Sequence, residues 1–244
     1  MKIIELSKIA LIIFDLDDTL IHSNIDYDLM KQHVKNLFNP DYKFKNNPTI
    51  KELLEILENN PDKINQAYAL IEQIESDSAK TIELIPNADL LPPLLKQMNV
   101  NSAILTNNSR QSVEKYLTFE KFKFLKEMGP IITRNDVSTM KPDPAGINKI
   151  IEYFSLNEKK SEVMYIGDSF IDADAAHYAG IRFLLVNSRK LDLSAFNFEP
   201  WKIFSNLSEL IQFFKEDLLD HIYGGIAFAI KSAIRSGSGK CPTR

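Results

Sequence analysis

Cysteine and glycine are scarce in this sequence. Its 244 residues include one Cys, Cys241, and eight Gly. A lone cysteine cannot form a disulfide within the chain, which fits a reducing compartment. The low glycine content argues against repeated glycine-rich ligand loops. We therefore expect a cytoplasmic protein.

Long apolar runs and an excess of positive charge are also absent. No run approaches the roughly 20 residues that span a bilayer, and the run Ile9–Phe14 is too short for the core of a signal peptide. The 29 basic and 33 acidic residues give a net charge of −4, which offers no overall attraction to nucleic acid. With 44% hydrophobic and 25% charged residues, the composition is typical of a globular protein with a sizeable core. The sequence predicts neither a membrane span nor a nucleic-acid partner.

Five short apolar runs are the strongest structural signal. Their apolarity is continuous, which is typical of parallel strands that are covered on both faces. Helical patterns lie between most of them, over Pro144–Phe154 and over Asp172–Ala179, where Gly180 provides a stop. This alternation predicts an α/β fold with a Rossmann-like parallel sheet and a ligand site at the carboxyl ends of the strands. The expected strands are Ile9–Phe14, Ser102–Leu105, Ile131–Thr133, Val163–Ile166 and Phe183–Val186.

One segment, residues 21–85, interrupts the alternation. It contains no convincing strand, but three apolar stripes have helical spacing and are separated by prolines. We expect an all-helical insertion between the first and second strands. The core then comprises residues 1–20 and 86–220.

The C-terminal stretch, residues 221–244, differs in character. It has no acidic residue but four basic ones, and isoleucines recur there every four residues, although Gly224 and Gly225 weaken a helix. Two interpretations stay open. This basic tail contacts a membrane surface or a partner, or it is a cloning or frameshift remnant.

Polar residues follow each of the first four strands. Asp15 and Asp17 follow the first strand, and residues two apart in an extended backbone point the same way, so both can face one site. The remaining candidates follow the second, third and fourth strands, and they are Thr106, Asn107, Lys141, Asp168 and Asp172.

This set of residue types indicates a particular chemistry. Clustered carboxylates repel one another unless a cation joins them. An all-oxygen set without histidine suits Mg²⁺ better than zinc. A lysine and a hydroxyl opposite the carboxylates suit a phosphoryl group, and a carboxylate can act as nucleophile through an aspartyl-phosphate. The site therefore predicts magnesium-assisted phosphoryl transfer.

The ordered set resembles the four motifs of the haloacid dehalogenase superfamily of phosphohydrolases. The first motif is Asp15-Leu16-Asp17-Asp18-Thr19, the second is Thr106, the third is Lys141, and the fourth runs from Gly167 to Asp172. The resemblance covers residues 8–20 and 86–188. A lone Asp-x-Asp would be weak evidence, but four motifs in order, each at an expected strand end, are strong evidence.

The resemblance implies a role for each residue of the first two motifs. Asp15 would be the nucleophile and a Mg²⁺ ligand. Asp17 would protonate the leaving oxygen and then activate water, and its carbonyl would also bind the metal. Thr106 and the backbone at Asn107 would hold phosphoryl oxygens.

The later motifs supply charge and support. By the same resemblance, Lys141 would neutralise charge on the nucleophile and the phosphate. Asp168 would complete the metal site, and Asp172 would support the metal or orient Lys141. Residues 21–85 resemble the small helical cap of this superfamily, with Asp26 and Tyr27 on a loop that would face the substrate.

The leading hypothesis is a Mg²⁺-dependent phosphatase that acts on a small phosphorylated metabolite, similar to phosphoglycolate phosphatases. A sugar phosphomutase of the same superfamily is the alternative among enzymes. Dehalogenation is disfavoured, because that chemistry does not use the pair Asp17 and Asp168. A phosphoacceptor signalling module is the alternative from another class, but its lysine comes last in the chain, whereas Lys141 precedes Asp168.

Overall fold

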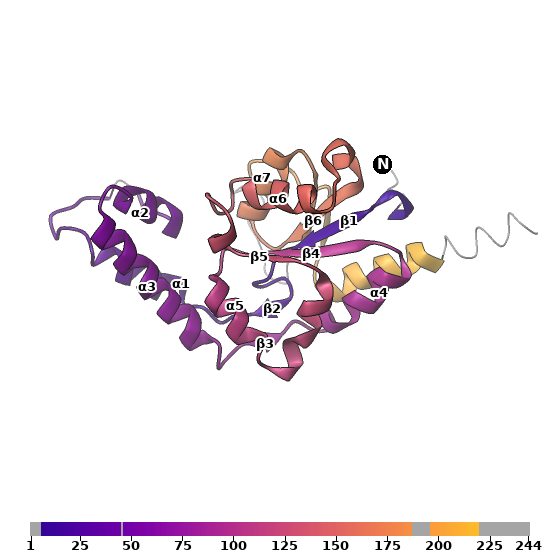
Figure 1. Ribbon diagram of the computed structural model, residues 1–244, viewed down its shortest axis with the longest axis horizontal. Coiled ribbons are helices and arrows are strands. Elements are labelled where there is room, and N and C mark those ends of the chain that lie inside the picture. Colours follow the sequence, from indigo (N-terminus) through magenta and orange to yellow (C-terminus); the bar gives the residue numbers. More distant parts are fainter. Residues whose placement is uncertain (1–5, 45, 187–195, 220–244) are drawn as a thin grey trace, which may run out of the picture.

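A parallel sheet of six strands forms the core of the protein (Figure 1). The computed structural model describes residues 6–44, 46–186 and 196–219. The strand order is β5-β4-β1-β6-β7-β8, and every neighbouring pair is parallel. The fold class predicted from the apolar runs is thus confirmed. The strands are β1 (Leu11–Phe14), β4 (Asn101–Leu105), β5 (Ile131–Ile132), β6 (Val163–Gly167), β7 (Arg182–Val186) and β8 (Lys202–Phe204).

Helices cover both faces of this sheet. Alternate strand residues point to opposite faces, so Ile12 and Phe14 join one hydrophobic cluster, whereas Leu11 and Ile13 join the other. The helices α4 (Leu91–Gln97), α5 (Arg110–Tyr116) and residues 207–219 pack on the first face. The helices α6 (Ala145–Tyr153) and α7 (Phe170–Ala179) pack on the second. Gly180 ends α7 with a φ of 75°, as its predicted role as a stop requires.

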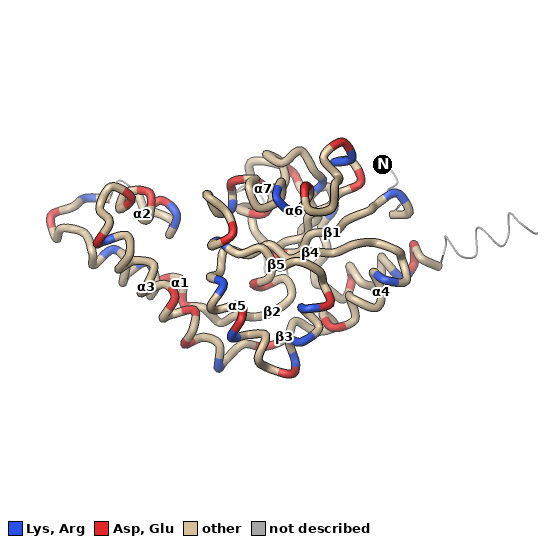
Figure 2. The backbone as a smooth tube through the Cα atoms, viewed as in Figure 1, with Lys and Arg blue, Asp and Glu red and all other residues tan. Residues whose placement is uncertain are grey.

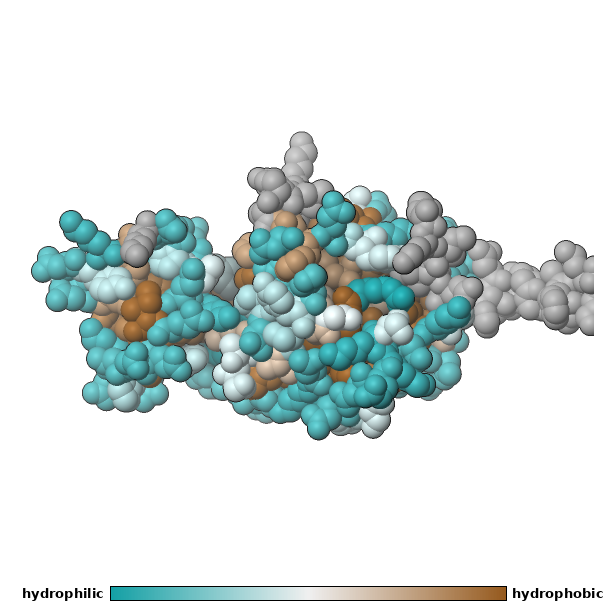
Figure 3. Space-filling model, turned by 90° about the horizontal axis from the view of Figure 1, so that it is seen from above, coloured by the Kyte–Doolittle hydropathy of each residue, from teal (hydrophilic) through white to brown (hydrophobic). Residues whose placement is uncertain are grey.

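The inserted segment carries three helices, which correspond to the three predicted stripes. They are α1 (Tyr27–Lys35), α2 (Ile50–Leu57) and α3 (Pro61–Ser78). Thr49 and Glu52 form a capping box at the start of α2, and Asn60 caps α3 ahead of a first-turn proline. The three helices share a hydrophobic cluster of their own. We refer to them as the cap, which forms a separate lobe with apolar side chains at its surface (Figure 3).

The expectation that residues 21–85 contain no strand is wrong at both ends of the segment. β2 (Ile21–His22) and β3 (Glu83–Leu84) pair antiparallel and form a short ribbon where the chain enters and leaves the cap. Two-residue strands leave no apolar pattern to read. Asn87 follows the ribbon with a φ of 70°, a conformation that asparagine tolerates better than most residues.

The remaining sequence expectations concern membrane spans, the distribution of charge and the C-terminal tail. Among the described residues, no helix is both long and apolar enough to cross a membrane. Acidic and basic residues are intermixed over the cap and the core in the view of Figure 2. The basic tail, residues 221–244, lies outside the described residues.

Candidate active site

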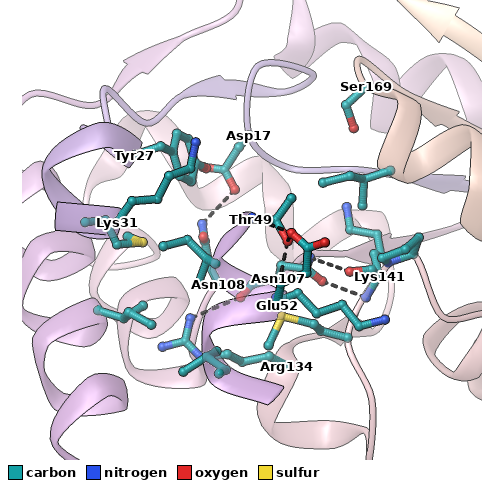
Figure 4. Close-up of a pocket in the computed structure, with 18 of the residues that line it drawn as sticks. Asp17, Tyr27, Lys31, Thr49, Glu52, Asn107, Asn108, Arg134, Lys141 and Ser169 are labelled. Atoms are coloured by element: carbon teal, nitrogen blue, oxygen red, sulfur yellow. Dashed lines mark hydrogen bonds between the residues drawn. The ribbon is translucent and has the colours of Figure 1, made fainter. Parts of the chain in front are cut away.

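The predicted site residues meet at the carboxyl ends of the central strands. Asp15 follows β1, Thr106 follows β4 and Asp168 follows β6. Because β1 lies between β4 and β6, these residues share one edge of the sheet. Lys141 reaches the same edge from the segment that precedes α6. A cavity of about 600 Å³ opens there between the core and the cap (Figure 4).

Lys141 is the hub of a buried hydrogen-bond network. Its Nζ donates to Oδ1 of Asp15, to Oδ1 of Asp172 at 2.8 Å and to the hydroxyl of Tyr165 at 3.0 Å. Burial alone would lower the pKa of Lys141, but the charges of Asp15 and Asp172 raise it above its ordinary value. The lysine is therefore held as a cation against the predicted nucleophile.

Asp172 belongs to this network but does not line the cavity. It is 1% exposed, and its Oδ2 accepts a hydrogen bond from the Ser169 hydroxyl at 2.6 Å in the capping box of α7. A Cβ at Gly167 would lie 2.6 Å from the Asp172 carboxylate, so glycine at that position lets the carboxylate approach. Its contact with the Lys141 ammonium fits one of the two roles that the resemblance implied, the orientation of Lys141, and that role stays a prediction.

Asp17 is held by polar side chains from the end of β4. Asn108 Nδ2 donates to Oδ2 of Asp17 at 2.7 Å, and the Thr106 hydroxyl donates to the same oxygen at 3.3 Å. Burial raises the pKa of Asp17, although hydrogen bonds from Ser23 and Asn108 partly offset this rise. A raised pKa favours a protonated carboxyl, which is the form that can give a proton to a leaving group.

Asn107 holds the backbone of Lys141 through its side chain. Its Nδ2 donates to the Lys141 carbonyl at 3.1 Å, and its Oδ1 accepts from the Lys141 N–H at 3.0 Å. The predicted contact of the Asn107 backbone with phosphoryl oxygens stays a prediction. The structure adds a second role, because the side-chain amide of Asn107 holds the backbone from which the Lys141 side chain extends.

Three carboxylates form a cluster that could hold a metal ion. One oxygen from each of Asp15, Asp168 and Asp172 lies within 4.8 Å of the others. Burial and the neighbouring Asp172 raise the pKa of Asp15, and the same two causes raise the pKa of Asp168 to about 8. Asp15 and Asp168 line the cavity. The raised pKa values show that burial and mutual repulsion both oppose the ionisation of these carboxylates. A hard divalent cation prefers oxygen ligands and would relieve that repulsion.

The two predicted residues of the cap loop occupy different environments. Tyr27 lines the cavity and is 45% exposed. Asp26, by contrast, is the N-cap of α1, and its Oδ1 accepts a hydrogen bond from the Leu29 N–H at 2.8 Å. The structure therefore gives Asp26 a capping role outside the cavity lining, whereas Tyr27 faces the place where a substrate would lie.

Glu75 and Arg134 are two of the charged cavity residues that were not predicted from the sequence. Glu75 extends from the cap helix α3, and Arg134 follows β5. Both side chains are at most 5% exposed, and they form an ion pair with each other. Arg134 follows a strand end, as the predicted residues do, and that position was the available signal. Nothing in the pattern of α3 marks Glu75.

Comparison with known proteins identifies the family. The profile of haloacid dehalogenase-like hydrolases matches residues 12–186, which include all the site residues described above. The chain belongs to this family. The resemblance read from the four motifs is thus confirmed, and the protein is a haloacid dehalogenase-like hydrolase.

Individual relatives agree with this assignment. The pyrophosphatase PpaX of Bacillus cereus is 25% identical over 189 residues, which cover 74% of this chain and 84% of the relative. A structure from Bacteroides fragilis, described as a candidate haloacid dehalogenase-like hydrolase, has a TM-score of 0.62 and 25% identity, over 83% of this chain and 99% of its own. A candidate phosphoglycolate phosphatase from Lactobacillus plantarum has a TM-score of 0.64 and 21% identity, over 83% and 97% of the two chains. The last of these likenesses concerns the fold alone.

Proposed function

We propose that this protein is a Mg²⁺-dependent phosphatase that hydrolyses a small phosphomonoester through an aspartyl-phosphate at Asp15. The observation that carries the proposal is the position of Asp15, which contacts the Lys141 ammonium and belongs to a crowded carboxylate cluster beside the cavity. A carboxylate in that position can attack phosphorus while positive charge stabilises the transition state.

The reaction has two steps. In the first, a carboxylate oxygen of Asp15 bonds to phosphorus, the bond to the leaving oxygen breaks, and Asp17 gives that oxygen a proton. In the second, Asp17 takes a proton from a water molecule whose oxygen attacks the same phosphorus, which releases inorganic phosphate and restores Asp15. Mg²⁺ held by Asp15, Asp168 and the Asp17 carbonyl would supply positive charge for the phosphoryl oxygens. Lys141 stabilises the same charge from the protein side.

The cap side of the cavity indicates the character of the leaving group. Half of the cap residues that line it are apolar or aromatic, namely Tyr27, Met30, Ile50, Leu54, Tyr68 and Ile71. The other half are polar or charged, namely Lys31, Thr49, Lys51, Glu52, Glu55 and Glu75. Tyr27 and Tyr68 are more than one third exposed although both are large and largely apolar. The apolar half of this lining gives a carbon-based leaving group a surface to pack against, which supports a phosphomonoester as the substrate.

Pyrophosphate hydrolysis is the second candidate, because it is the activity that the name of the Bacillus cereus relative states. The test is a panel of phosphorylated metabolites and pyrophosphate, each assayed with MgCl₂ and with EDTA. We expect Mg²⁺-dependent phosphate release from at least one phosphomonoester, at higher kcat/KM than from pyrophosphate. Preferred release from pyrophosphate would contradict the first candidate in favour of the second.

The panel also separates the remaining alternatives. A sugar phosphomutase would convert one phosphosugar into an isomer with little phosphate released. A phosphoacceptor signalling module would form a stable aspartyl-phosphate without turnover. We place the reaction in the cytoplasm, which the use of a single cysteine supports.

Mg²⁺ should stabilise the folded protein, and more so at higher pH. A folded-state pKa of about 8 keeps Asp168 protonated where the unfolded chain, with an ordinary pKa of about 4, has released the proton. The folded state then binds more protons, so the free energy of unfolding of the metal-free protein falls as the pH rises from about 4 to about 8. Saturation at about 100 Kd adds about 2.7 kcal/mol, or about 5–10 °C in Tm for a domain of this size.

This prediction is tested by thermal melts from pH 5 to pH 8 in EDTA and in MgCl₂. The variant Asp168→Asn should flatten the pH dependence in EDTA and lose most of the gain from Mg²⁺. An equal Mg²⁺ effect in the wild type and in Asp168→Asn would contradict the assignment of Asp168 to the metal site.

Tyr27 and Asp26 provide a matched pair of cap variants. Tyr27→Ala should lower kcat/KM by about 10-fold or more for esters with large apolar leaving groups, because it removes part of the cavity wall. It should spare acetyl phosphate, which is too small to reach the cap. Asp26→Ala should instead cost about 1 kcal/mol of stability as a lost N-cap and leave the selectivity unchanged. The reverse assignment of the two effects would show that Asp26 contacts the substrate.

A further inference from the structure

A buried carboxylate of the cap is anchored in the core. Glu75 lies on α3, and its side chain is 4% exposed. Its Oε1 accepts a hydrogen bond from Nη1 of Arg134, and its Oε2 accepts from the Ser109 N–H at 3.2 Å and from the Ser112 hydroxyl at 2.9 Å. A buried charge is costly unless it is paired and hydrogen-bonded. The seating of α3 on the core therefore determines whether Glu75 keeps these partners.

On the core side, Arg134 connects this anchor to the lysine of the active site. Its Nη1 also donates to the carbonyl of Asn107 at 3.0 Å. Asn107 in turn makes the two reciprocal hydrogen bonds with the backbone of Lys141, whose Nζ reaches Asp15. Figure 4 shows Asn107 between Arg134 and Lys141, with hydrogen bonds to each. The path from the cap to the nucleophile is thus unbroken.

We propose that Glu75 and Arg134 are positioning residues that set the place of Lys141 when the cap is seated on the core. The inference rests on the proposed function, since it concerns the same phosphoryl-transfer site. A misplacement of about 1 Å at a reacting group can cost about 10²-fold in rate. Cap seating then affects the chemical step as well as the choice of substrate.

Direct binding of the substrate by Arg134 is the competing interpretation. Nη2 of Arg134 is buried, makes no hydrogen bond among the described residues, and belongs to a side chain that lines the cavity. However, Glu75 already neutralises the guanidinium, and Glu72 lies 3.9 Å from Nη2. Two carboxylates beside one guanidinium disfavour a further anion at this place.

The experiment measures kcat and KM for p-nitrophenyl phosphate and for an alkyl phosphate in MgCl₂. We expect Glu75→Gln and Arg134→Gln to lower kcat by about 10²-fold, equally for both esters and with KM little changed. Arg134→Lys should recover part of kcat, because it keeps the charge and a donor. The double variant Glu75→Gln/Arg134→Gln should be no slower than either single variant, since all three break the same path.

Arg110→Gln is the matched control. Arg110 pairs with Asp136, at the other end of the same short turn (Arg134–Asp136), but its partners lie in the core. Its loss removes an ion pair of the same kind, though a more exposed one, without touching the cap or Asn107. We expect Arg110→Gln to keep kcat close to the wild type even if its Tm falls.

Each other result has a defined meaning. Wild-type kcat in the folded Glu75 and Arg134 variants would overturn the inference and leave the proposed function standing. A loss confined to KM or to one ester would overturn it in favour of direct substrate binding by Arg134. A wild-type protein without Mg²⁺-dependent hydrolysis would overturn the proposed function and the inference together. If Glu75→Gln does not fold, Ser112→Ala removes one hydrogen bond from the same carboxylate, and a kcat equal to that of Arg110→Gln would then count against the inference.

Discussion

Asp15→Asn should lower turnover by about 10⁴-fold or more, the scale on which enzymes lose activity with their nucleophile. The amide cannot form the acyl phosphate, and the loss of its charge also weakens the metal site. The fold should persist, because Asn can still accept a hydrogen bond from Lys141. Removal of one charge from the cluster with Asp168 and Asp172 should even raise the Tm of the metal-free protein.

The measurement is steady-state hydrolysis of the best ester of the panel, with a thermal melt in EDTA on the same sample. Asp174→Asn is the control, since Asp174 is a buried carboxylate on α7 that contacts Asn197 and lies outside the cavity lining. It should retain turnover. Turnover near the wild-type value in folded Asp15→Asn would exclude Asp15 as nucleophile.

The central part of the fold could be predicted because burial on two faces leaves a continuous apolar run. β1, β4 and β6 lie in the middle of the sheet, and their residues are nearly all buried. β8 lies at the edge, where the burial of Lys202, Ile203 and Phe204 varies, so no such run exists. β2 and β3 are held by the chain reversal at the base of the cap rather than by their own sequence.

The residues of the site also differ in whether they could be predicted from the sequence. Residues at strand ends could be predicted, because parallel strands bring their carboxyl ends to one edge. Asn108 was missed although it directly follows the predicted Thr106 and Asn107. Glu75 could not be found, since its burial depends on Arg134, which is 59 residues away in the chain. A charged residue on a surface helix is usually solvated, and only the packing of α3 against the core reverses that expectation.

Asp17→Asn should slow turnover by about 10²-fold or more, and the loss should depend on the leaving group. An alkoxide is a poor leaving group and needs a proton as the bond to phosphorus breaks, whereas p-nitrophenolate leaves without one. The first step should therefore suffer most for alkyl phosphates. Asn108 Nδ2 and the Thr106 hydroxyl can still donate to the side-chain oxygen of the substituted amide, so the site should keep its shape.

The comparison is a series of esters whose leaving groups span a wide range of pKa, assayed for the wild type, Asp17→Asn and Lys141→Ala. For Asp17→Asn, log kcat/KM should fall more steeply as the pKa of the leaving group rises. Lys141→Ala should lower activity on every ester alike, because Lys141 acts on the phosphoryl charge that all of them share. Comparison of Lys141→Ala with Asp17→Asn therefore separates charge stabilisation from proton transfer within one site. Equal losses across the series for both variants would show that Asp17 shapes the metal site and does not transfer the proton.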